Sequence, residues 1–199
     1  MRVTPTAPFS SQESLSCDMA LLDRIAREDK SAFETFYRNY FPRLSRFLER
    51  ITRRPALVEE IINDTMLVVW RKAATYNHSC KVSTWLFAIA FRKALKALKC
   101  VDDPTDAVAA DSAQPLNAGP EAALSRHQLR VAVQQTMAEL SIEHRAVIEL
   151  TYYHGYACRE IAAIMDCPVD TVKTRMFYAR RRLKTLLSSH AEGSEWRGE

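Results

Sequence analysis

Glycine is scarce in this chain, and its scarcity limits the possible folds more than any other feature. The 199 residues hold four glycines: Gly119, Gly155, Gly193 and Gly198. Because no two lie closer than five residues, the sequence cannot build a glycine-rich phosphate loop or a dinucleotide-binding turn. Runs of β-branched residues are also few, which argues against an all-β fold. The sequence therefore excludes most nucleotide-dependent α/β enzymes and predicts an all-α fold.

Charge is sorted along the chain, although the formal net charge is only +4. Residues 81–99 hold five basic side chains and no acid, and residues 171–184 hold six basic side chains and no acid. Between them, residues 101–121 hold five acids and no base. Two basic segments separated by an acidic one indicate a protein that meets a polyanion at two places.

Composition divides the chain into two helical domains. Residues 101–120 combine three prolines, one glycine and four aspartates, which is typical of a flexible linker. We expect a first domain over 18–100 and a second over 121–189. A disordered arm is expected over 1–17 and a disordered tail over 190–199.

The first domain contains a strongly amphipathic segment. From Phe33 to Ile51, aromatic and aliphatic residues recur at steps of three and four, which predicts a helix over 31–51 with a buried aromatic side. Ser31 and Glu34 have the spacing of a capping box and predict where this helix begins.

A second helix is predicted to begin at Pro55, since proline suits the first helical position. Its apolar side is expected to face the core: Val58, Ile61, Ile62, Thr65, Met66 and Val69. The opposite side carries a mixed stripe: Glu60, Asn63, Asp64, Leu67 and Arg71. Leu67 is the apolar member of this stripe. Such a face either binds another protein or is a solvated face with one exposed leucine.

A third helix is predicted over 83–99, capped by Ser83 or Thr84. The loop before it, residues 76–81, is rich in small polar and aromatic side chains. Exposed rings beside a basic helix suit single-stranded nucleic acid, because bases stack on the rings while cations follow the phosphates. The alternative is an ordinary basic surface helix whose Trp85 belongs to the core.

The second domain is predicted to hold a helix over 121–139, a helix capped by Ser141 and ended near Gly155, a short helix over 158–165 and a last helix over 169–187. Gly155 stands where a left-handed residue is wanted. A short helix, a tight break at residues 166–168 and a basic helix form a helix-turn-helix pattern.

The last helix has two distinct sides. Its apolar side is expected to pack inward: Val172, Met176, Ala179, Leu183 and Leu186. The residues on its other side are expected to face outward: Lys173, Thr174, Phe177, Tyr178, Arg181 and Lys184. The first turns of such a helix enter the major groove of DNA. The alternative is a charged C-terminal helix favoured by its own dipole.

Cysteine usage and hydropathy exclude several classes of protein. The five cysteines are odd in number and form no CxxC pair, which favours a reducing cytoplasm over a disulfide framework. His154, Cys158 and Cys167 match no standard zinc spacing, so we expect no metal and no cofactor. No signal peptide is predicted at the start of the chain. The longest uncharged apolar run, residues 82–91, is shorter than the roughly 20 residues that span a bilayer.

Together these motifs resemble the bacterial RNA polymerase sigma factors of the sigma-70 family, in the small extracytoplasmic-function (ECF) group. Residues 59–70 resemble the core-binding helix of sigma region 2, and residues 82–90 resemble its Thr-Trp-Leu element. Residues 159–162 and 167–175 resemble the helix-turn-helix of sigma region 4. The resemblance covers about residues 20–100 and 121–188.

The resemblance implies three sets of site residues. The stripe on the second helix would dock on core polymerase through Glu60, Asn63, Asp64, Leu67 and Arg71. The loop and third helix would capture the −10 element through Asn77, His78, Ser79, Lys81, Trp85, Arg92 and Lys93. The last helix would read the −35 element through Thr171, Lys173, Thr174, Arg175, Phe177, Tyr178 and Arg181.

The resemblance also implies the partners. They are core RNA polymerase (its β′ clamp helices and β flap), promoter DNA and an anti-sigma factor, with no small-molecule substrate and no catalytic residue. A free-standing helix-turn-helix regulator with a ligand-binding or dimerisation domain is the alternative function. An enzyme that uses Glu59, Glu60 and Asp64 is disfavoured, because no histidine or cysteine converges on that helix.

Overall fold

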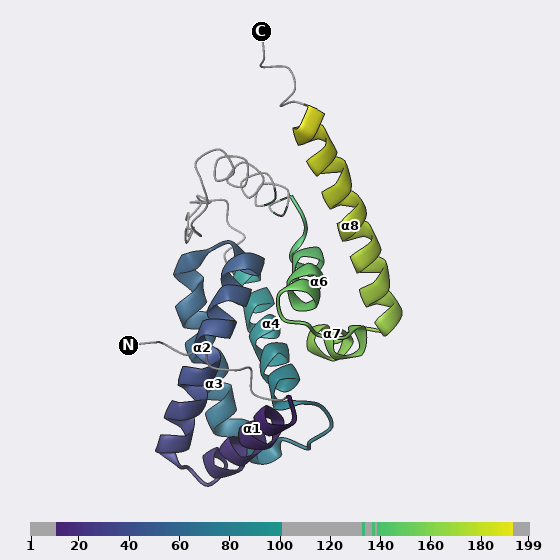
Figure 1. Ribbon diagram of the computed structural model, residues 1–199. Helices are drawn as coiled ribbons and strands as arrows, with labels where there is room; N and C mark the ends of the chain where they lie inside the picture. Colours follow the sequence, from purple (N-terminus) through teal and green to yellow (C-terminus); the bar gives the residue numbers. More distant parts are fainter. Residues whose placement is uncertain (1–10, 101–132, 134–136, 138, 193–199) are drawn as a thin grey trace, which may run out of the picture.

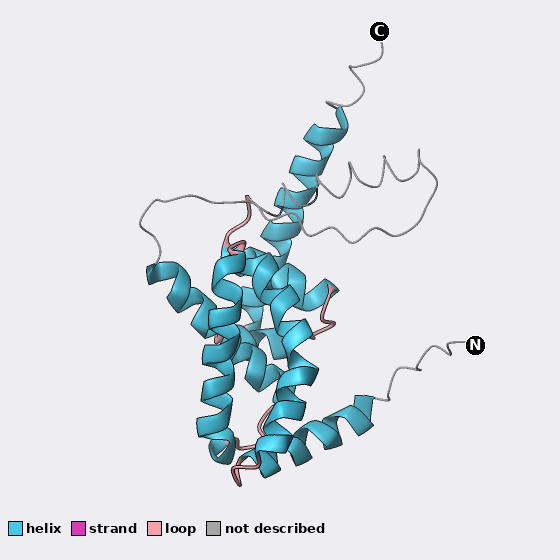
Figure 2. Cartoon of the chain, turned by 90° about the vertical axis from the view of Figure 1, so that its left-hand side faces the viewer, coloured by secondary structure: helices cyan, strands magenta, loops and turns pink. Residues whose placement is uncertain are grey.

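The structure is a computed structural model that describes residues 11–100, 133, 137 and 139–192. Every regular element in the described part of the chain is a helix, as the cyan ribbon of Figure 2 shows. The elements fall into an N-terminal bundle, α1 to α4, and a C-terminal bundle, α6 to α8 (Figure 1). The expected all-α fold is confirmed. The expected linker, 101–120, lies outside the described residues.

The N-terminal bundle buries the apolar sides that the sequence predicts. It consists of α1 (Ser11–Ile25), α2 (Lys30–Thr52), α3 (Pro55–Lys72), the short 3₁₀ helix η1 (Ala73–Thr75) and α4 (Val82–Cys100). Phe36, Leu44 and Phe47 of α2 are completely buried. All six residues expected on the inner side of α3 are buried, and Pro55 occupies its first turn.

The helix starts in this bundle differ from two expectations. Asp29 caps α2, because its carboxylate accepts hydrogen bonds from the backbone amides of Ser31 and Ala32. Hydrogen bonds from the side chains of Ser31 and Arg24, and then from the amide of Ala32, hold the pKa of Asp29 far below its usual value. The capping box of Ser31 and Glu34 was therefore a wrong prediction. Helix α4 begins at Val82, so neither Ser83 nor Thr84 precedes it as a cap.

Two helices extend into segments expected to be disordered. Helix α1 begins at Ser11, inside the arm expected over 1–17, and places Leu21, Leu22 and Ile25 in the core. Helix α8 (Val169–Glu192) continues past residue 187 into the expected tail. The expectations of disorder rested on composition, whereas a helix continues from a turn already anchored in the core.

The C-terminal bundle contains the expected helix-turn-helix. It consists of α6 (Ile142–Tyr152), α7 (Cys158–Met165) and α8. Ser141 caps α6 by accepting a hydrogen bond from the amide of His144. Gly155 has φ of +68°, the left-handed conformation that its position requires. Asp166 also takes a left-handed conformation, and it ends α7 before the turn into α8.

The two bundles pack against each other. Helix α7 lies beside α4, and α6 lies beside α2 (Figure 1). One continuous set of buried apolar side chains runs through both bundles. The arrangement brings the loop before α4 next to the first helix of the helix-turn-helix.

Candidate functional site

The mixed stripe on α3 forms a single exposed face. All five predicted residues are exposed: Glu60, Asn63, Asp64, Leu67 and Arg71. Leu67 keeps 44% of its surface accessible, so it is one of the exposed large apolar residues of the molecule. An apolar side chain surrounded by charged and amide groups is the usual anatomy of a protein-binding face.

Neighbouring helices support this face. The hydroxyl of Tyr37 on α2 donates a hydrogen bond to the amide oxygen of Asn63, 3.2 Å away. Lys93 of α4 forms an ion pair with Asp64 at 2.8 Å. The structure therefore joins a residue predicted to bind the −10 element to a residue predicted to bind polymerase, which the sequence did not indicate.

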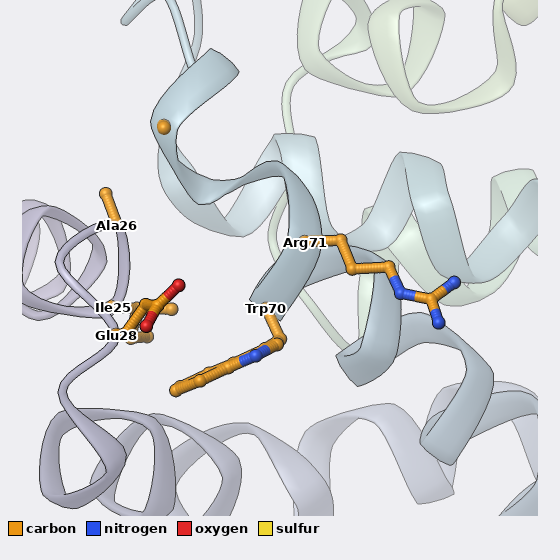
Figure 3. Close-up of a pocket in the computed structure, with 6 residues that line it drawn as sticks. Ile25, Ala26, Glu28, Trp70 and Arg71 are labelled. Atoms are coloured by element: carbon orange, nitrogen blue, oxygen red, sulfur yellow. The ribbon is translucent and has the colours of Figure 1, made fainter.

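A small pocket lies at the end of the face, between α1 and α3. Its volume is about 270 Å³, and its lining includes Ile25, Glu28, Trp70 and Arg71. Figure 3 shows the guanidinium of Arg71 extending away from Ile25 and Glu28, while the ring of Trp70 lies toward them. Arg71 is thus directed outward, as a docking residue requires.

The loop before α4 carries a cluster of rings. Tyr76 lies 4.7 Å from the ring of His78 and 5.4 Å from the ring of Trp85, measured between centroids. The hydroxyl of Tyr76 donates to the backbone carbonyl of Cys80, and the side chain of Asn77 accepts from the amide of Ser79. These bonds hold the loop in one shape.

Exposure divides the predicted −10 residues into two groups. Five of them are exposed: Asn77, His78, Ser79, Lys81 and Arg92. Trp85 and Lys93 are half-buried. Trp85 packs against the core, as the core interpretation expects, and its role in binding the −10 element stays a prediction.

Helix α8 presents the predicted basic and aromatic side. Five of the seven predicted −35 residues are exposed: Lys173, Thr174, Phe177, Tyr178 and Arg181. Thr171 and Arg175 are half-buried. The guanidinium of Arg175 lies 3.7 Å from the sulfur of Cys167 in the turn, which fixes its direction. Val172, Met176 and Ala179 are buried, as expected.

Two ion pairs join the bundles. Glu149 of α6 is only 3% exposed, and its carboxylate meets the guanidinium of Arg50 on α2 at 3.1 Å. Burial raises the pKa of Glu149, although Arg50 opposes the shift. Lys81, a predicted −10 residue, pairs with Glu160 of α7 at 2.8 Å. A predicted DNA contact is thus occupied by a carboxylate of the other bundle.

Aromatic rings also pack between the two bundles. His154 lies 5.0 Å from the ring of Phe87 and 5.8 Å from the ring of Phe47. Burial lowers the pKa of His154 to about 4, helped by the charges of Arg43, Arg50 and Arg46. The imidazole is therefore neutral at physiological pH and packs as an aromatic ring.

The contact between the bundles was not predicted from the sequence. A signal was present, since Glu149 stands among the apolar residues of α6 and a lone acid on a buried side needs a cation. The cation, however, is 99 residues away in the chain. Local periodicity cannot identify such a partner.

Comparison with known families decides between a sigma factor, a free-standing regulator and an enzyme. Residues 36–102 match the family described as Sigma-70 region 2, and residues 130–183 match Sigma-70 region 4. The ECF RNA polymerase sigma factor SigK of Mycobacterium tuberculosis is 32% identical, over 87% of this chain and 95% of SigK. The chain belongs to the ECF sigma factors of the sigma-70 family.

Other relatives agree with this assignment. RNA polymerase sigma-H factor of Pseudomonas aeruginosa is 26% identical to this sigma factor, over 85% of this chain and 93% of the relative. Two solved structures share its fold. CnrH, solved with the cytosolic domain of CnrY, has a TM-score of 0.63 at 20% identity, and the match covers 87% of this chain and 98% of CnrH. RpoE of Bartonella quintana, solved with the anti-sigma factor NepR, has a TM-score of 0.55 at 24% identity, covering 78% and 98% of the two chains.

Two further properties concern the described part of this sigma factor. Within it, no group of histidine, cysteine, aspartate and glutamate side chains could hold a metal ion. Its helices are also too short or too polar for any of them to cross a membrane.

Proposed function

We propose that this sigma factor binds core RNA polymerase through the exposed face of α3 and directs it to promoters with −10 and −35 elements. The observation that carries the proposal is the arrangement of Glu60, Asn63, Asp64, Leu67 and Arg71 as one exposed face, on a helix matched by sigma region 2. The corresponding polymerase surface is the β′ clamp helices, and the C-terminal bundle meets the β flap.

The DNA contacts are assigned to two surfaces. The loop at residues 77–81 and the start of α4 capture unpaired bases of the −10 element. Stacking on rings contributes roughly 1–3 kcal/mol per base. Flipping a base out of the duplex costs a few kcal/mol. Capture therefore succeeds only while polymerase holds the duplex. The first turns of α8 read the −35 element in the major groove.

Simultaneous contact with both elements requires the bundles to separate. The −35 and −10 elements are about 25 base pairs apart, which is about 85 Å of duplex at 3.4 Å per base pair. Helix α7 has eight residues, is about 12 Å long and contacts α4. The start of α8 follows directly, so it cannot lie 85 Å from α4 in the packed arrangement.

The remaining assignments follow from the same function. The chain performs no catalysis of its own, since polymerase makes the RNA, and it acts in the cytoplasm beside polymerase and DNA. An anti-sigma factor is expected as a regulator, as NepR is for RpoE of Bartonella quintana. The free-standing regulator is not favoured, because both bundles match sigma regions.

The assignment of α8 is tested by replacing Arg175. Arg175→Ala is expected to weaken the preference for the −35 element by about 1–3 kcal/mol, because one guanidinium contact to a base edge is lost. The measurement is transcription by the holoenzyme from templates with and without an intact −35 element. Arg182→Ala is the matched control, since Arg182 lies two turns beyond Arg175 on α8, past the first turns assigned to the groove, and pairs with Glu139. Equal −35 dependence in both variants would contradict the assignment.

A further inference from the structure

Three arginines form an exposed stripe along α2. Arg43, Arg46 and Arg50 follow one another at steps of three and four, so they lie on one side of the helix. We call them the arginine stripe. Like charges at this spacing repel one another and weaken a helix. Elsewhere on α2 the repulsion is avoided, since Arg38 pairs with Glu34 at 2.6 Å. Anionic groups on other helices offset the repulsion, since the charge of Arg43 acts on Asp18 of α1 and Arg50 pairs with Glu149 of α6.

The C-terminal bundle supplies carboxylates to this side of the N-terminal bundle. Glu149 meets Arg50, and Glu160 meets Lys81. Tyr156 interacts with both Glu160 and Arg43 of the stripe. Carboxylates and phosphates are both anionic acceptors that arginine binds through its forked N–H groups. The two glutamates thus occupy places that phosphates can take once the bundle moves away.

An aromatic ring lies under the same surface. The guanidinium of Arg43 lies 5.7 Å from the centre of the Phe87 ring. In the packed arrangement that ring also touches His154 and Tyr156 of the C-terminal bundle. Departure of the bundle removes these two contacts and leaves cations beside an accessible aromatic face. Cations with stacking rings are the composition of single-strand binding surfaces.

We propose that the arginine stripe, with Lys81 and the ring of Phe87, binds the backbone of the unpaired promoter strand. The C-terminal bundle covers this site with Glu149 and Glu160 until it moves toward the −35 element. The inference rests on the proposed function, because it needs the bundles to separate. Continuity favours DNA as the ligand, since Lys81 belongs both to this surface and to the loop assigned to the −10 element.

The test measures binding of fluorescein-labelled oligothymidine to the full chain by anisotropy over a range of salt concentrations. The variant Glu149→Gln/Glu160→Gln removes both covering charges. It is expected to bind about tenfold more tightly than the unsubstituted chain, with a steeper salt dependence, because more phosphates are neutralised. Absence of any gain would overturn the proposal.

Two further substitutions in that variant locate the site. Arg46→Gln is expected to reduce the slope of log affinity against log salt by about 0.7, the contribution of one phosphate contact on a single strand. Arg38→Gln, on the same helix, should leave the slope unchanged. Equal behaviour of the two would overturn the assignment to the stripe. Oligoglutamate, added at the same concentration of charges as the DNA, is the competitor. If it displaces the DNA, and Arg46→Gln weakens this competition, the site binds an acidic protein segment and the DNA assignment is wrong.

The same two substitutions in holoenzyme separate this inference from the proposed function. Arg46→Gln should make promoter opening more sensitive to salt, whereas Arg38→Gln should not. A holoenzyme that transcribes normally and shows no difference between them would overturn the stripe alone. A chain that does not bind polymerase would overturn the proposed function, while the oligothymidine measurement would still decide the stripe.

Discussion

Replacing Leu67 with aspartate is expected to lower the affinity for core polymerase by at least about a hundredfold, the effect of losing a central apolar anchor. Leu67 lies between the polar members of the α3 face and is 44% exposed. The proposed docking buries it, and an aspartate in its place would then be desolvated without a partner. The free chain should fold normally, since substitutions at exposed positions usually change stability by less than about 0.5 kcal/mol.

The measurement is a titration of labelled sigma factor with core polymerase, with circular dichroism as the check on folding. Met19→Asp is the matched control, because Met19 is an apolar residue of α1 with a similar exposed fraction of 38%. It should bind core as the unsubstituted chain does. If Leu67→Asp binds with unchanged affinity, α3 does not dock through this face.

Reversing the charge of Glu149 is expected to separate the bundles. Glu149→Lys places a second cation against Arg50 at a site where the side chain is almost completely buried. Breaking a buried ion pair costs about 3–5 kcal/mol. The lower end of this range of free energies applies here, because the Arg50 side chain is 43% exposed and so keeps part of its contact with water. Small-angle X-ray scattering should show a larger radius of gyration.

A charge swap controls for simple misfolding. The double variant Arg50→Glu/Glu149→Lys restores an ion pair with the opposite orientation and should return the radius of gyration toward the original value. Glu143→Lys, in the first turn of the same helix, should leave the chain compact. A Glu149→Lys chain as compact as the unsubstituted one would show that this pair does not hold the bundles together.

Elements defined by local periodicity could be predicted from the sequence. The buried side of α3 and the bounds of α7 agree with expectation, because apolar side chains at three- and four-residue steps must face the core whichever partners they meet. Gly155 was predictable for a similar reason, since few residues accept its left-handed conformation.

Two kinds of feature could not be predicted: the choice between two possible cap residues, and contacts between residues far apart in the chain. Asp29 and Ser31 are both good caps, and Arg24 bonds to both of them, so residue type alone does not decide which one caps α2. The contact between the bundles joins residues far apart in the chain, such as Lys81 and Glu160. Nothing in the local pattern of either segment specifies the other.

The candidate site was predictable as a set of residues but not as an arrangement. Exposure of the α3 face and of the outward side of α8 follows from helical periodicity. The ion pairs of Asp64 with Lys93 and of Lys81 with Glu160 do not. Both pairs neutralise lysines predicted to bind DNA, so internal contacts occupy part of the proposed DNA surface.

The most direct test is run-off transcription with purified core polymerase and a library of genomic fragments. Core with the full chain should start RNA synthesis at a small set of positions that share −35 and −10 sequences, and core with the Leu67→Asp chain should not. Start sites that are the same with and without the chain would contradict its assignment as the subunit that selects promoters.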